Sequence, residues 1–190
     1  MPLADLVKDL DDADVNVRLR ALSRGVAERP PGLVKAVRER VALQKDPAVR
    51  SAFVTALVRL GEDGLLREVA RALRHRDPVV VKGAARVLGE IGDVRAVPNL
   101  IEAFKTEDEG IGAAVAKALG QLGDVVVVPW LIAALEQSFC GAACAAALGL
   151  LGDARALPAL TKAQASSEPS TKLAAAQALF ALQERAHGAG

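Results

Sequence analysis

The fold is decided by residues 77–105, which read DPVVVKGAARVLGEIGDVRAVPNLIEAFK. Asp77 is a favoured N-cap residue, and Pro78 suits the first helical position, where no backbone N–H is needed. The apolar residues that follow recur at helical spacing: Val80, Ala84, Val87, Leu88 and Ile91. Gly92 can adopt the left-handed conformation that ends a helix, and Asp93 then caps the next one. We therefore predict two helices joined at a glycine with positive φ.

The second predicted helix also has one apolar face. Its apolar residues are Ala96, Val97, Leu100, Ile101 and Phe104. Neither helix can bury its apolar face alone, so such pairs must stack on one another.

The same pair of helices recurs along the chain. Glycines mark the end of each first helix at intervals of 31, 31 and 29 residues: Gly61, Gly92, Gly123 and Gly152. Leucines keep the same register: Leu57, Leu88, Leu119, Leu148 and Leu179. A fixed period in unrelated residue types indicates a repeat protein. We predict an all-α, right-handed α-solenoid of stacked helical pairs, with repeats of about 31 residues.

We expect one solenoid domain, 1–190, and the repeat register divides it into segments. The predicted segments are an N-terminal capping helix (1–11), an irregular repeat (12–44), regular repeats (45–166), a C-terminal capping helix (167–183) and a flexible tail (184–190). The regular repeats are expected to start near Lys45, Arg76, Glu107 and Ser138. Phe180 stands where earlier repeats carry glycine, as expected of a helix with no partner helix after it.

The pattern D-P-x-V…A-x-x-L-G-x-I-G-D-x-R-A-V-P-x-L-I-x-A-L resembles the short HEAT-like repeats of bacteria, including the phycobilin-lyase type. The resemblance covers residues 45–183 closely and 1–44 loosely. It implies an α-solenoid whose second helices line the concave face, and it implies binding more often than catalysis. Bacterial modules of this kind are associated with signalling assemblies.

The leading functional prediction is a non-enzymatic scaffold that binds a partner protein on its concave surface. In register, the residues expected to face the partner are Glu68, Arg71, Asn99, Glu102, Trp130 and Lys162. Helices stacked in a fixed array hold such side chains in place, so little ordering entropy is lost on binding.

Trp130 is the expected centre of this surface. It lies off the stripe that Val127, Leu131 and Leu135 define, and Val125 and Val126 precede it. An exposed apolar patch marks an interaction site, which also suggests a homo-oligomer formed through the apolar C-terminal half. The alternative is that Trp130 lies over a neighbouring helix.

Two other functions remain open. Residues 15–76 hold 14 Lys and Arg against 6 Asp and Glu, a basic stretch that could bind nucleic acid, as the similar HEAT-like alkylpurine DNA glycosylases do. These cations could equally be solvated or pair with the acidic residues 1–14. The resemblance to lyase-type repeats allows a bilin lyase or chaperone, although no reactive Cys or His is placed to support it.

No catalytic, cofactor-binding or metal-binding residue is predicted. Cys140 and Cys144 could chelate a metal, but in register both occupy core positions, and no histidine lies within 40 residues. The two histidines, His75 and His187, form none of the His-Glu pairs that the HEAT-like di-iron hydroxylases use. With two cysteines and no secretory or membrane-spanning segment, we expect a cytoplasmic protein, and its composition suggests a bacterial one.

Overall fold

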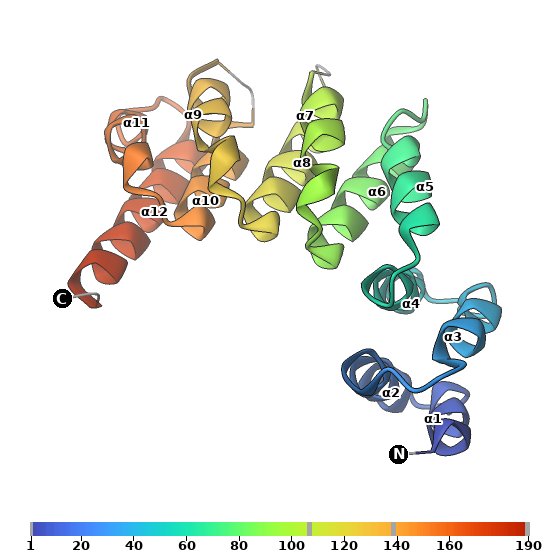
Figure 1. Ribbon diagram of the computed structural model, residues 1–190. Helices are drawn as coiled ribbons and strands as arrows, with labels where there is room; N and C mark the ends of the chain where they lie inside the picture. The colour runs from blue at the N-terminus through green and yellow to red at the C-terminus, as the bar shows by residue number, and fades with distance from the viewer. Residues whose placement is uncertain (1, 106–107, 138–139, 189–190) are drawn as a thin grey trace. The chain divides into compact units, whose positions relative to one another are not determined.

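The computed structural model describes residues 2–105, 108–137 and 140–188, and all regular secondary structure there is helical (Figure 1). The α-helices are α1 (Leu3–Leu10), α2 (Val15–Glu28), α3 (Leu33–Val41), α4 (Pro47–Arg59), α5 (Asp63–Ala72), α6 (Pro78–Ile91), α7 (Val97–Phe104), α8 (Glu109–Leu122), α9 (Val128–Gln137), α10 (Gly141–Leu151), α11 (Leu157–Ala163) and α12 (Pro169–Gly188). Short 3₁₀ turns precede α7, α9 and α11. The fold class is the expected all-α solenoid of helical pairs.

The helices belong to two compact units, Met1–Glu68 and Val69–Gly190, where one domain was expected from the length. The boundary falls within α5. Each unit is described by itself below. Glu107 and Ser138, the expected starts of two repeats, lie outside the described residues.

Aspartate side chains start the first helix of several pairs. Asp46 Oδ1 accepts from the N–H groups of Ala48 and Val49 at 2.7 and 3.2 Å. Asp77 caps α6 in the same way, through the N–H of Val79 at 2.8 Å. These bonds satisfy backbone donors that a helix start leaves unpaired.

Glycines end the first helices as predicted. Gly92 and Gly123 have φ values of 74° and 73°, and Gly152 follows with 72°. An L-residue with a side chain is strained in this left-handed region, and glycine is not. The predicted positive φ values are confirmed.

The first unit is built around a small aliphatic core. Phe53 is its largest fully buried side chain, and it packs in one cluster with Leu6 and Leu10 of α1 and Leu33 and Val37 of α3. Helix α1 therefore covers the end of this unit's core, because Leu6 and Leu10 are almost completely buried.

The second unit has two layers (Figure 1). Helices α6, α8, α10 and α12 pack on one another in order and form the first-helix layer. Helices α7, α9 and α11 form the second-helix layer, and they pack on α8, α10 and α12 respectively. Each second helix therefore fills the space beside the first helix of the next repeat.

Glycine and alanine meet where successive first helices cross. A Cβ added at Gly89, Gly120 or Gly149 would lie 2.9, 3.0 or 2.9 Å from an alanine Cα of the next helix. Such distances leave no room for a side chain, so the backbones of this layer approach closely.

The second-helix layer is packed more loosely, since α7, α9 and α11 pack mainly on first helices and reach one another through an aromatic pair and an ion pair. The expectation that the second helices line the concave face stays a prediction.

Two further expectations need correction. Val80 was assigned to the core of α6, but it is 37% exposed and Val81 is buried in its place. The last helix was expected to end near Gln183, but α12 continues to Gly188. Arg185 holds this extension, since its Nη1 donates to the carbonyl of Leu150 at 3.1 Å.

Candidate functional site

The six residues predicted to face a partner do not form one cluster. Glu68 is exposed on α5 and belongs to the first unit. The others lie in the second unit: Arg71 on α5, Asn99 and Glu102 on α7, Trp130 on α9 and Lys162 on α11. Arg71, Glu102 and Lys162 are exposed, whereas Asn99 and Trp130 are half-buried. The candidate site is therefore the second-helix layer, from α7 to α11.

Trp130 is not the free surface ring that register predicted. Its indole meets the ring of Phe104 edge to face, with the centroids 4.3 Å apart and the planes at 81°. The two half-buried rings join α9 to α7 across the gap between them. Such aromatic pairs add about 0.5–1.5 kcal/mol beyond the area they bury. The alternative interpretation, that Trp130 lies over a neighbouring helix, is therefore correct.

Each helix that carries one of the two rings also takes part in an ion pair. On α7, Lys105 Nζ donates to Glu102 at 2.7 Å. This hydrogen bond lowers the pKa of the Glu102 carboxyl, and the positive charge of Arg74 lowers it further. Glu102 is thus held in its charged form by two cations.

The second ion pair connects α11 with α9. Lys162 Nζ donates to Glu136 at 2.8 Å, so the predicted surface lysine is engaged with the preceding repeat. Both groups remain exposed to solvent, and exposed pairs of this kind contribute only about 0–1 kcal/mol. Their effect is to connect α11 with α9, the helix that carries Trp130.

The valines before Trp130 behave as predicted. Val125 and Val126 are 47% and 66% exposed, while Val127 and Val128 are buried. Arg155 Nη2 donates to the carbonyl of Val125 at 3.0 Å, which ties this turn to the following repeat. The expectation that this apolar region forms a homo-oligomer stays a prediction.

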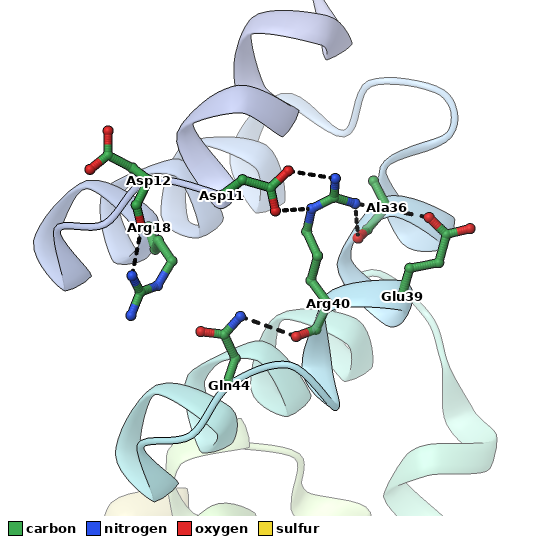
Figure 2. Close-up of polar contacts among 7 residues, drawn as sticks. All are labelled: Asp11, Asp12, Arg18, Ala36, Glu39, Arg40 and Gln44. Atoms are coloured by element: carbon green, nitrogen blue, oxygen red, sulfur yellow. Dashed lines mark hydrogen bonds and ion pairs between the residues drawn. The ribbon is translucent and has the colours of Figure 1, made fainter.

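The arginines of the basic stretch serve as internal connections in the first unit. Arg40 forms two 2.7 Å hydrogen bonds with the carboxylate of Asp11, and its Nη1 donates to the carbonyl of Ala36 (Figure 2). Arg18 points back to the backbone of the α1–α2 connection and donates to the carbonyl of Asp12 at 2.6 Å (Figure 2).

Other arginines of this unit have similar contacts. These pairs are Arg24 with Asp9, Arg38 with Glu62, Arg29 with the carbonyl of Arg59, and Arg50 with the carbonyl of Gln44. The Asp11 pKa is lowered by its hydrogen bonds from Arg40. The basic stretch thus pairs in part with the acidic residues 1–14, one of the two explanations that its charge allowed.

The cysteines lie in the core, as register indicated. Cys140 and Cys144 are 4% and 0% exposed, with their sulfur atoms 3.8 Å apart. In the part of the chain that the structure describes, no group of three or more His, Cys, Asp or Glu side chains is arranged to hold a metal ion. Nor is any described helix long and apolar enough to cross a membrane.

Sequence reasoning missed two members of the candidate site. Phe104 was counted as a core residue, and Glu136 was not considered as a partner of Lys162. The signal was present in the register, because position 104 in one repeat and position 130 in the next are both aromatic. What register does not give is how far a long side chain reaches between helices.

Comparison with known proteins agrees with this architecture. Residues 66–139 match the family model of HEAT repeats, and residues 142–166 match that of the PBS lyase HEAT-like repeat. Together these matches span just over half of the chain. None of the curated protein sequences matches it.

Several solved structures share the fold. The complex of CpcE and CpcF of phycocyanin lyase from Nostoc sp. PCC7120 matches with a TM-score of 0.58 and 22% identity, over 99% of this chain and 68% of that one. Human deoxyhypusine hydroxylase, in complex with glycerol, matches with a TM-score of 0.56 and 22% identity, over 96% and 74%. An engineered protein matches at 0.53 and 19% identity, over 97% and 98%. At these identities the likeness concerns the fold alone.

Proposed function

Because this chain belongs to the HEAT repeat family, we propose that it is a non-enzymatic interaction module that binds a partner protein through the second-helix layer of its second unit. The observation that carries the proposal is the half-buried pair of Trp130 and Phe104, set between exposed charged groups. Protein interfaces commonly combine an aromatic centre with a polar rim.

The ion pairs support the same surface. Glu102 and Lys162 carry opposite charges on α7 and α11, with Trp130 on the helix between them. Each of these charges is already paired, Glu102 with Lys105 and Lys162 with Glu136, so a partner that covers the rings would meet an ion pair on each side. Fixed charges at the rim of an interface contribute to specificity more than to affinity.

Nucleic-acid binding is the less favoured function, because many arginines of residues 15–76 already contact carboxylates or carbonyl groups within the first unit. A bilin lyase is supported only by the match of residues 142–166 to the PBS lyase HEAT-like repeat and by the shared fold. The proposal includes a cytoplasmic location, because the two cysteines are free thiols and need no oxidising compartment.

The test is a pull-down of the tagged chain from lysate of its source organism, followed by mass spectrometry and a direct binding measurement with the purified partner. Trp130→Ala should weaken binding at least about tenfold, as expected for an interface anchor. Phe180→Ala is the matched control, since it removes an exposed aromatic side chain from α12, in the first-helix layer. Equal binding by both variants and the parent chain would show that the partner binds elsewhere.

A further inference from the structure

A groove lies between α6 and α8, on the first-helix layer of the second unit. Its volume is about 320 Å³, and its lining residues are Lys82, Gly83 and Arg86 of α6 with Ala114, Lys117 and Gln121 of α8. This volume is at the lower end of the range for ligand pockets in proteins. None of these residues belongs to the second-helix surface described above.

The base of the groove is made of small residues. Gly83 and Ala114 occupy equivalent positions in successive repeats, 31 residues apart. A Cβ added at Gly83 would meet no heavy atom within 4 Å, so the space above this glycine is open. A ligand can therefore approach the backbone of α6 closely at this point.

The rim of the groove is cationic. Lys82, Arg86 and Lys117 are all exposed, and Arg86 forms an ion pair with Glu90 at 2.7 Å. Within residues 2–105, 108–137 and 140–188, no carboxylate forms an ion pair with Lys82 or Lys117. Two ammonium groups on neighbouring helices are thus available to an anionic ligand.

Lys82 reaches across the groove toward α8. Its Nζ lies 3.5 Å from the point where a Cβ of Gly110, at the start of α8, would stand, and Oδ1 of Asp108, which accepts from the Ile111 N–H, lies 3.2 Å from the same point. The groove therefore has a cation from α6 near the beginning of α8, and Lys117 and the Gln121 amide further along α8. An amide can both donate and accept a hydrogen bond, which suits a peptide backbone.

We propose that this groove binds an acidic peptide segment of a partner protein, with its carboxylates at Lys82 and Lys117 and a side chain over Gly83. The charge of the surrounding chain favours a short acidic segment over nucleic acid. Residues 77–190 hold 9 Lys and Arg against 12 Asp and Glu, a net charge of −3. This negative charge repels a long polyanion such as nucleic acid. The groove is separate from the second-helix surface, so each can fail without the other.

The probe is a short fluorescein-labelled peptide of alternating Glu and Ala, titrated with the full chain and followed by fluorescence anisotropy. The same peptide with Gln in place of Glu is the ligand control. We expect Lys82→Gln with Lys117→Gln to weaken binding of the acidic peptide at least about tenfold. Lys8→Gln with Lys35→Gln removes the same charge from exposed sites of the first unit, and should change affinity less than about twofold.

A second variant tests the shape of the groove without changing its charge. Gly83→Leu fills the open space and is compatible with the helix, so we expect binding to fall at least about tenfold while the melting temperature is kept or raised. Equal binding by the Gln peptide, or unchanged binding by the double lysine variant or by Gly83→Leu, would overturn the proposal. So would tighter binding of a duplex DNA that competes with the peptide, since the groove would then be a nucleic-acid site.

Discussion

The contact between Gly149 of α10 and Ala178 of α12 allows a sharp test of how the repeats are held together. A Cβ at Gly149 would stand 2.8 Å from the Ala178 Cβ and 2.9 Å from its Cα. Carbon atoms in ordinary contact are about 3.5–4.0 Å apart. Gly149→Ala therefore requires α12 to move away by several tenths of an ångström, because the obstacle is backbone and not a flexible side chain.

The expected free-energy change combines two opposite effects. Alanine is favoured over glycine inside a helix by about 0.8–1.0 kcal/mol. Overpacking costs about 1–3 kcal/mol, and the upper part of that range applies here because α12 also packs on α11. We expect Gly149→Ala to lower the free energy of unfolding by about 1–2 kcal/mol.

Gly83→Ala is the matched control, since it makes the same substitution in the same layer at a site with no neighbour within 4 Å. This control should raise the free energy of unfolding by up to about 1 kcal/mol. At about 2–4 °C per kcal/mol, the melting temperatures of the two variants should differ by about 5–10 °C, with opposite signs relative to the parent chain. Circular dichroism measures both. A rise in melting temperature for Gly149→Ala equal to that of Gly83→Ala would refute the reasoning about a tight helix crossing.

Further predictions concern the ring, the ion pair and the thiols. Trp130→Ala should cost about 2 kcal/mol in urea unfolding, since its ring is half-buried and paired, and a cost below about 0.5 kcal/mol would contradict the pairing. Because Arg40 lowers the pKa of Asp11, their pair stabilises the fold above about pH 4, and this stabilisation is lost as the pH falls through the lowered pKa. Arg40→Gln should remove up to about 1 kcal/mol at neutral pH and less near pH 3, and an equal loss at both would contradict it. Cys140→Val with Cys144→Ala should leave helix content and zinc content unchanged, and loss of stoichiometric zinc would refute their place in the core.

The parts of the fold that depend on local backbone chemistry could be predicted from sequence. An aspartate followed by proline, and a glycine followed by aspartate, fix where α6 begins and ends, and the structure agrees at Asp77 and Gly92. The phase of that helix was harder to predict. Three consecutive valines, at positions 79–81, leave the apolar face uncertain by one residue, and Val81 is buried where Val80 was expected.

The candidate site was less predictable because it depends on contacts between repeats. Register placed Trp130 correctly off the core of its own helix, yet the ring meets Phe104 from the preceding repeat. The close approach of successive first helices had a readable signal in the recurring glycines, such as Gly120, where an added Cβ would stand 3.0 Å from an alanine Cα of the next helix.

The ion pairs between second helices restrict how the repeats could be reordered in evolution. Arg74 acts on Glu102, and Glu136 pairs with Lys162 at equivalent positions, but with the signs reversed. The glycine crossings of α6, α8 and α10 are alike. Loss of residues 106–136 by recombination would place Gly89 opposite Ala147 but would bring Lys105 to the side of Lys162, two like charges. The small residues thus allow repeats to be exchanged, whereas the charged residues limit which repeats can be neighbours.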